Sequence, residues 1–459
     1  MYRSTNGGPG TINWQDIKLR WNYRTDLVHD TANVTMQVFA IEMVYVPQGS
    51  FYLGDGNVNT LPSSNGFRKN NQPTLTPTGR EAYLVTSEAG LSFQTSASTT
   101  LTGIYDPLMI PTVNVTSPSS FPKGFNAFYC QKYEVSQKQY VDFFNTLPTA
   151  PVADPQKGNR NLQQTAASAN RNAFNWSTAN LDDANLTKFG TAHSGDRAQN
   201  WMSWTDALAY ADWAALRPMT EFEFEKAARG RDVTYGPIYP INGEYAWGNT
   251  TITAISGTLT SDGTTSEGVT SPTTSNSNCN YNTVTIGTGS GNTQGPARCG
   301  IFAAKNRTPN QRLQSGASFY GIMEMSGNLE EWVMHNGVQG NNTCYYSSGA
   351  GMSMFNVFDG SHGDGNLDAG GSHDVTNWLI YPGYYIGGSV MPAGIFMTVK
   401  GGAWNTTAGD TKLRVSYREF SNPLTSTCSS SGRSAAYVNS SLGSSRYATI
   451  GFRPVRTAP

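Results

Sequence analysis

The sequence lacks any apolar run that approaches the length of a membrane-spanning helix, and it lacks a charge imbalance. A bilayer crossing needs about 20 consecutive apolar residues, so we expect no membrane insertion. Charged residues make up only 14% of the chain and the formal net charge is −1, which leaves no electrostatic field to attract nucleic acid or anionic lipid. Nucleic acid is therefore not an expected partner. A neutral surface rich in Ser, Thr, Asn and Gly suits extracellular, cell-surface or virion proteins.

The start of the chain also lacks the pattern of a signal peptide, because Met1 is followed by polar residues. Residues 12–40 alternate between apolar and polar positions, as strands that complete a sheet do. This pattern is compatible with a fragment of a longer protein. We therefore expect 1–40 to be a strand segment, compatible with the end of a preceding domain, and 41–459 to be one domain.

No two of the five cysteines form a C-x-x-C pair, which removes support for zinc-ribbon and thioredoxin-like proteins. A bridge across a loop between Cys279 and Cys299 is one hypothesis, and five unpaired thiols are the alternative. The odd number leaves at least one thiol free.

The chain does contain enough apolar residues, 37% of the total, to build a sizeable core. Short strands are predicted at 42–47, 50–53 and 450–455. Few helices and many short strands indicate an α+β fold. Polar, turn-rich stretches predict long insertions, near 55–125, 146–195, 250–295 and 335–395.

Three helices are predicted, one from residue 136, one from residue 203 and one from 220 to 230. Ser136 with Gln139, and Thr220 with Glu223, fit capping boxes, in which two side chains satisfy backbone amides at a helix start. Gly230 fits a left-handed stop. The two phenylalanines of the third helix cannot share one face, so we expect that helix to be covered on two sides.

Eight segments resemble, in the right order, the signatures of the formylglycine-generating, or sulfatase-modifying, enzyme family. Each alone is weak support, whereas eight in order across residues 41–457 are specific. The segments are EMVYVPQGSF (42–51), YEVSQKQY (133–140), MSWTDA (202–207), RPMTEFEFEKAARG (217–230), YGIMEMSGNLEEW (320–332), KGGAW (400–404), RVSYR (414–418) and IGFR (450–453). The resemblance implies a C-type-lectin-like α+β fold with long loop insertions, whose first and last strands pair.

In the resembled family, two cysteine thiolates just after a GGSW segment bind copper and activate oxygen. Thiolates are needed because soft Cu(I) prefers sulfur ligands. Counted forward from Trp404, the equivalent positions are Thr406 and Thr411; counted back from the RVSYR segment, they are Asn405 and Asp410. None of the four is a cysteine, so we expect neither copper nor this catalysis.

The family also carries structural calcium, and Asn328, the Leu329 carbonyl and Glu331 fall on the positions of one calcium site. Amide, carbonyl and carboxylate oxygens together suit a hard cation. Asn280 and Tyr281 match a second site, without a clear following Asp. Turn capping without a metal is the alternative at the first site.

Two histidines, His362 and His373, lie in a Gly- and Asp-rich loop. A metal pair and two solvated side chains are both compatible with this spacing. The acidic residues of 359–368 lack the EF-hand spacing, so we expect a solvated loop there.

A noncatalytic branch of this fold, the variable proteins of diversity-generating retroelements, carries its variable ligand face between the GGSW and GFR segments. Residues 405–449 lie there. They include no Trp, Gln or Met, a single Lys (Lys412) and a single Glu (Glu419). Randomised adenines in Asn codons cannot encode these five residue types. Ser, Thr, Tyr, Gly and Arg dominate, as in adaptable binding surfaces. An ordinary Ser-rich loop is the alternative.

We therefore expect a ligand-binding protein that is not an enzyme, with a protein or glycan on another cell or particle as its target. An oxygen-dependent metalloenzyme with non-cysteine ligands and a structural surface module are the other hypotheses. Aromatic and Arg side chains supply rigid area and planar hydrogen bonds. The expected contacts are Trp404, Asn405, Tyr417, Arg418, Phe420, Tyr437, Arg446 and Tyr447.

Overall fold

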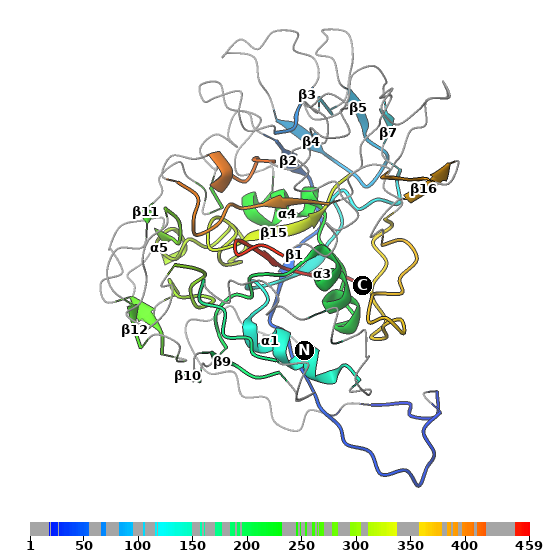
Figure 1. The fold of residues 1–459 in the computed structure, drawn as a ribbon. Helices are drawn as coiled ribbons and strands as arrows, with labels where there is room; N and C mark the ends of the chain where they lie inside the picture. Colours follow the sequence, from blue (N-terminus) through cyan, green and yellow to red (C-terminus); the bar gives the residue numbers. More distant parts are fainter. Residues whose placement is uncertain are drawn as a thin grey trace.

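Three helices and two three-stranded sheets form the centre of the described part of the chain in a computed structural model (Figure 1). None of the described helices is both long and apolar enough to cross a membrane. The described residues are 18, 20–25, 27–54, 66–69, 82–94, 104–105, 115–116, 118–148, 157, 160, 170–176, 184–188, 191–192, 195–231, 245–246, 248, 253–254, 259–261, 264, 266–269, 278–282, 294–303, 311–336, 358–378, 383–386, 389–392, 397–407, 411–418 and 446–459.

The three predicted helices are present and begin at capping boxes. Ser136 precedes α1 (Gln137–Thr146), and Thr220 precedes α4 (Glu221–Arg229). Both predicted boxes are confirmed. The helix does end at Gly230, whose φ is 88°, but its ψ of −161° lies outside the left-handed helical region, so the predicted left-handed stop is wrong. Helix α3 (Trp204–Trp213) has a third box, in which Ser203 pairs with Asp206. The short helices are α5 (Gln311–Ser315) and η4 (Thr411–Leu413).

The first sheet has the order β1 (Met43–Val46), β8 (Phe128–Gln131) and β20 (Val455–Thr457). Both outer strands run antiparallel to β8, with Cys130 opposite Val44 on one side and Val455 on the other. The expectation that the first and last strands pair with each other is therefore wrong, since β8 lies between them. Strand β1 is an edge strand, and Tyr45 on it is 51% exposed.

The second sheet lies at the centre of the fold and has the order β18 (Met397–Lys400), β15 (Glu330–Met334) and β19 (Ile450–Phe452). Strand β15 is buried along its whole length and pairs antiparallel with β18 and parallel with β19. The predicted final strand is thus two strands, because the chain leaves the second sheet after Phe452 and joins the first at Val455.

Helix α4 lies between two apolar clusters, and every one of its residues is buried. Phe222 packs in the larger cluster with Phe67 and Phe93, whereas Phe224 packs in the smaller one with Phe128. The prediction that this helix is covered on two sides is confirmed. Figure 1 shows α4 beside β15, at the centre of the molecule.

Short strand pairs occur within or beside the predicted insertions. One four-stranded sheet has the order β3 (Arg68–Lys69), β6 (Ile104–Tyr105), β5 (Ser92–Gln94) and β7 (Val115–Thr116). The two-stranded pairs are β2 (Phe51–Leu53) with β4 (Tyr83–Val85), β9 (Thr187–Lys188) with β10 (Thr191–Ala192), β11 (Thr253–Ala254) with β14 (Asn278–Cys279), β12 (Leu259–Thr260) with β13 (Gly268–Val269), and β16 (Gly383–Ile386) with β17 (Ser389–Pro392).

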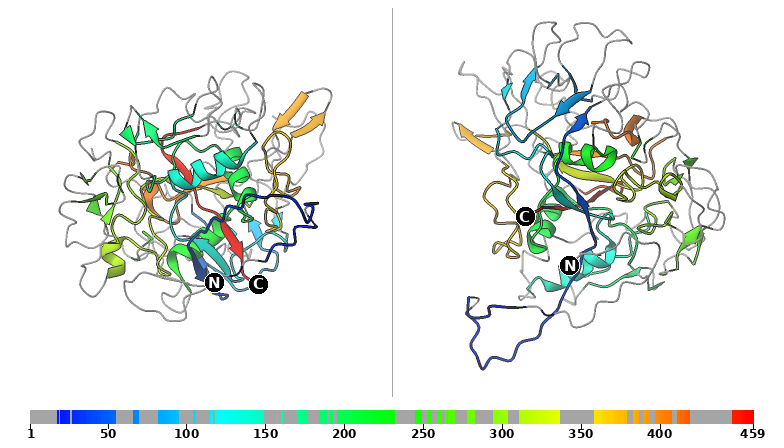
Figure 2. Two further views of the ribbon diagram at one scale, coloured as in Figure 1. Left: turned by 90° about the horizontal axis from the view of Figure 1, so that it is seen from below. Right: turned by 180° about the vertical axis from the view of Figure 1, so that it is seen from behind.

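The described residues before β1 form no strand, although alternation in residues 12–40 predicts strands. Instead the chain leaves the body as an arm (Figure 2). Residues 31–40 are all exposed, so no packing holds this arm in a sheet.

A buried ion pair joins the two sheets. Arg453 lies between β19 and β20, and its guanidinium donates to both carboxylate oxygens of Glu331 on β15, at 2.6–3.0 Å. It also donates to the carbonyls of Gln131 and Met323. Both charged side chains are fully buried, so each depends on the other for its charge compensation.

Replacing Arg453 with Met should lower the free energy of unfolding by about 3–5 kcal/mol, because Glu331 is then buried without a partner. Urea denaturation followed by circular dichroism measures this change. Arg24→Met is the matched control, since Arg24 and Asp30 form an exposed pair, and it should leave the midpoint unchanged. Equal effects of the two variants would contradict the assignment.

Candidate functional site

The loop after β18 is built on two glycines with positive φ, 97° at Gly401 and 68° at Gly402. A Cβ at Gly402 would lie 2.8 Å from the Leu413 side chain, so only glycine fits this close approach. Trp404 then donates its backbone amide to Asn328 and its indole Nε1–H to Ala448. These contacts fix the start of the segment 405–449 against the body.

Arg418 holds this segment at a second point. Its Nε donates to Glu221 at 2.8 Å, and its guanidinium lies 3.7 Å from the centre of the Phe67 ring. His335 Nδ1 lies 2.5 Å from the same carboxylate. Burial raises the pKa of Glu221, but Arg418 and then His335 outweigh that effect and hold it well below its usual range.

Arg446 holds the far end of the segment. Its Nε and Nη2 donate to the two oxygens of Asp206 at 2.8 and 2.9 Å, and Arg160 donates to the same carboxylate at 3.0 Å. Asp206 also completes the capping box of α3. The described ends of 405–449 are therefore tied to the starts of α3 and α4 by buried charge pairs.

The eight predicted ligand contacts separate by exposure. Asn405 is exposed, and Tyr417, Arg446 and Tyr447 are half-buried. Trp404 and Arg418 are 6% and 0% exposed, so the prediction that they contact a ligand is corrected. Trp404 packs in an apolar cluster, and Arg418 compensates the buried carboxylate of Glu221. Phe420 and Tyr437 lie outside the described residues.

The residues predicted to bind calcium form a buried hydrogen-bonded network. Asn328 Oδ1 accepts from Asn280 Nδ2 and from the Ala297 amide, and Glu134 accepts from Asn328 Nδ2 and from the Leu329 amide. The Asn280 Oδ1 atom is buried and accepts no hydrogen bond from the part of the chain that the structure describes.

Glu331 does not fit a calcium ligand in this arrangement, because Arg453 engages both of its oxygens. Tyr281 is 6% exposed and packs against Leu413 in an apolar cluster. Calcium binding by Asn280, Tyr281, Asn328 and the Leu329 carbonyl stays a prediction.

The three described cysteines are free thiols. Cys279 therefore does not bridge to Cys299, and its Sγ–H donates to the Ser326 carbonyl. Burial raises the pKa of Cys130 to about 12 and the pKa values of Cys279 and Cys299 well above the usual one. Cys344 and Cys428 lie outside the described residues. The described thiols are thus protonated at neutral pH.

The two loop histidines do not form a pair. His362 Nε2 accepts the backbone amide of Thr457 at 2.9 Å, whereas the His373 ring packs against Trp378. Burial lowers both pKa values to about 4, so both rings are neutral at pH 7.

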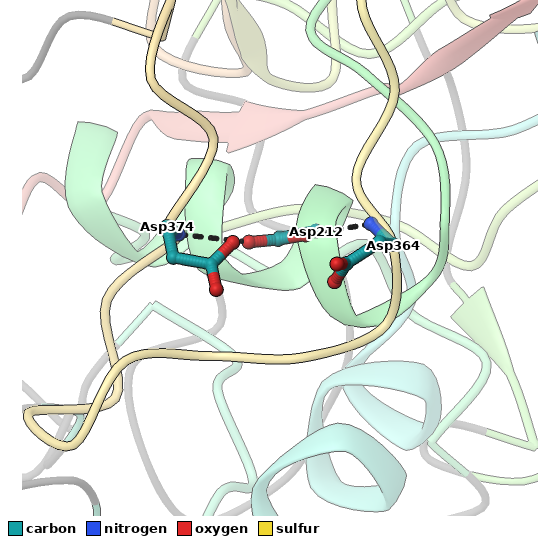
Figure 3. A group of neighbouring side chains, drawn as sticks. All are labelled: Asp212, Asp364 and Asp374. Atoms are coloured by element: carbon teal, nitrogen blue, oxygen red, sulfur yellow. Dashed lines mark hydrogen bonds between the residues drawn. The ribbon is translucent and has the colours of Figure 1, made fainter. Parts of the chain in front are cut away.

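Residues 358–378 instead wrap around the end of α3 and bring three carboxylates together (Figure 3). The oxygens of Asp212 accept the backbone amides of Asp364 and Asp374 at 3.0 and 3.1 Å. A Cβ at Gly363 would lie 2.3 Å from the Asp212 Cα, so the loop approaches as closely as glycine allows. Sequence reasoning missed Asp212, because nothing local links it to a loop about 150 residues later.

Burial raises the pKa of Asp212 to about 6; the two amides oppose this shift, and the charges of Asp364 and Asp374 add to it. No described basic side chain forms an ion pair with any of the three carboxylates. Asp212 therefore holds its proton to a higher pH in the folded protein than in the unfolded chain.

The model of a family described as "sulfatase-modifying factor enzyme 1-like domain" matches residues 117–458. A search of curated proteins finds no match. The predicted domain start at residue 41 lies before the matched range and stays a prediction.

Two solved structures are distantly similar. PvdO from Pseudomonas aeruginosa is 14% identical, with a TM-score of 0.33 over 91% of this chain and 95% of that chain. Variable protein 1 of Treponema denticola is 13% identical, with a TM-score of 0.33 over the same shares, 91% and 95%. Likenesses this distant assign neither protein's properties to this chain.

The Asp212 carboxylate should make stability depend on pH. Its folded pKa of about 6 lies above the ordinary Asp value of about 3.9, so the folded state binds more protons between these values. Its contribution to the free energy of unfolding is then greatest at acid pH and falls as pH rises through about 6.

Asp374→Asn removes one repelling charge beside Asp212, so it should raise the unfolding temperature at about pH 7.5 and change it little at about pH 4.5. Asp368→Asn is the matched control, because it lies in the same loop outside the three-carboxylate cluster. Thermal unfolding at the two pH values measures the difference. A shift of equal size at both would refute the role of Asp212.

Proposed function

Because the chain belongs to the sulfatase-modifying factor enzyme 1-like domain family, we propose that it uses this fold to bind a ligand at residues 405–449 and does not generate formylglycine. The single observation that carries the proposal is the absence of sulfur where the resembled enzymes place their copper ligands. Asn405, Thr406, Asp410 and Thr411 stand there.

Of these four residues, Thr406 and Thr411 are buried, which supports a structural role for both. The Thr406 hydroxyl accepts the Ala403 amide at 3.0 Å and closes the turn. Thr411 is buried at the start of η4. Cys279 packs in the same apolar cluster as Leu413, but its protonated thiol donates to a carbonyl. Soft Cu(I) prefers thiolates, and these groups do not provide them.

The clamped ends of the segment support the binding proposal. Buried ion pairs at Arg418 and Arg446 hold the chain on both sides of the stretch between them. The carboxylates that bind these anchors, Glu221 and Asp206, lie outside that stretch. A rigid frame with changeable residues between its anchor points is the arrangement of adaptable binding surfaces.

The proposed ligand is a protein or glycan on another cell or particle, and the proposed location is extracellular, at a cell surface or on a virion. A neutral chain with 14% charged residues favours recognition by hydrogen bonds and aromatic contact over electrostatic attraction. Among the described residues, Asn405, Tyr417 and Tyr447 are the proposed contacts that are exposed or half-buried. Arg446 is half-buried as well, but its guanidinium is bound to Asp206. Diversification of 405–449 by a retroelement belongs to the same proposal.

Two measurements test the proposal. Purified protein supplied with Cu(I) and a cysteine-containing sulfatase-motif peptide should consume no oxygen beyond the peptide's own background. The DNA beside the gene should contain a near-copy of the segment encoding 400–456 that differs almost only at adenines, next to a reverse-transcriptase gene. Oxygen consumption with conversion of the peptide cysteine would overturn the binding proposal, and absence of the near-copy would remove diversification.

Binding itself should depend on Asn405. The protein is applied to glycan and surface-protein arrays, and the strongest ligand found is titrated against Asn405→Ala. We expect a loss of about tenfold in affinity, or about 1.4 kcal/mol, with an unchanged unfolding temperature because Asn405 is exposed. Asn126→Ala is the matched control, since Asn126 is also exposed but lies on another loop. Equal affinity of both variants would remove Asn405 from the ligand face.

A further inference from the structure

The arm before β1 exposes apolar side chains that a stable surface normally covers. Residues 31–40 are all exposed, and Val34, Met36 and Val38 retain 49%, 58% and 65% of their accessible surface. Phe39, whose ring lies 5.2 Å from that of Trp213, fixes the base of the arm to α3. Figure 2 shows the rest of the arm standing away from the body.

The far end of the arm has a defined turn. Thr25 donates its amide to Asn22, and Val28 donates to Tyr23, both at 3.0 Å. Arg24 and Asp30 form an ion pair across the turn. The arm therefore presents a shaped surface whose exposed limb, residues 33–41, makes no hydrogen bond to any described residue.

An extended limb of this kind offers unpaired backbone groups to another strand. Proteins usually protect such an edge with charged residues, proline or a bulge, but residues 31–41 contain no Asp, Glu, Lys, Arg or Pro. The limb also runs directly into β1, an edge strand of its sheet. Its chemistry therefore favours pairing with a further strand, as in recognition by strand addition.

We propose that residues 33–39 pair antiparallel with the same residues of a second copy of this chain, across a two-fold axis at Met36. The sequence VTMQV at 34–38 has the same apolar–polar order in both directions. Val34 then lies opposite the partner's Val38, and Met36 lies opposite its own counterpart. Such a self-complementary pattern is what an isologous interface requires.

Charge does not oppose this pairing. The first acidic residues outside the limb, Asp30 and Glu42, would lie opposite each other beyond the paired stretch, and each already has a basic partner, Arg24 and Lys132. Within 33–39 every directly opposed pair is uncharged, and like charges directly opposed are what destabilises strand pairs. The limb continues into β1. The pairing therefore places the folded domains of the two copies on opposite sides of the two-fold axis at Met36.

The first test is the oligomeric state of the full chain, measured by light scattering after size exclusion at about 5–50 μM, a range that populates a dimer whose Kd is near ~1 μM. We expect a dimer. Met36→Lys places two ammonium groups opposite each other and should weaken the dimer at least tenfold without changing the circular dichroism spectrum. Leu27→Lys is the matched control, since Leu27 is 93% exposed in the turn and outside the pair. A monomeric wild-type protein, or equal effects of both variants, would overturn the proposal.

The second test reads the register. Met36→Cys should form a disulfide-linked dimer under mild oxidation, because directly opposed Cβ atoms lie about 4.5–5.5 Å apart. Thr35→Cys should not, because its own counterpart sits on the diagonal at about 7–8 Å, beyond disulfide reach. Mixing Thr35→Cys with Gln37→Cys should restore the crosslink. Equal crosslinking of Met36→Cys and Thr35→Cys would overturn the two-fold register, and a dimer that does not crosslink at Met36 would place the interface elsewhere.

Discussion

Carboxylates on two capped helices bind basic side chains that arrive from distant parts of the chain, and the rest of the fold depends on these pairs. Asp206 of α3 holds Arg446, Glu221 of α4 holds Arg418, and Glu225 of α4 holds Lys400. All six side chains are buried or nearly so. A chain with few charges therefore places many of them inside, where removing one partner costs far more than on the surface.

In this arrangement, the residues that hold the candidate ligand face in place differ from the residues that would contact a ligand. We call the first group the frame. The frame consists of the glycine turn at 401–402, the two arginine anchors and β19, and each is fixed by contacts to the body. The acidic partners of the two anchors, Glu221 and Asp206, lie outside 405–449. Affinity and specificity can then change at the face while the core keeps the interactions on which stability depends.

Local features were predictable and distant pairings were not. The capping boxes at Ser136 and Thr220 involve residues three apart, so the sequence alone predicts them. Composition cannot distinguish an arginine that meets a ligand from one that compensates a buried carboxylate, and Arg418 was therefore predicted as a contact. Two other features follow from tertiary packing that no local pattern encodes. Strand β8 lies between β1 and β20, and Asp212 lies beside the carboxylates of residues 358–378.

The position of the last two strands determines what a frameshift or premature stop within 405–449 does to the fold. Strand β19 pairs with β15, Arg453 compensates Glu331, and β20 completes the first sheet. All three lie downstream of residues 405–449, so a ribosome must read through that segment in frame before the body can close. A frameshift or premature stop there leaves Glu331 as a buried charge without a counterion and both sheets one strand short. Such a product loses the strand pairings and the ion pair that join the two sheets, whereas an in-frame substitution within 405–449 keeps β19, Arg453 and β20.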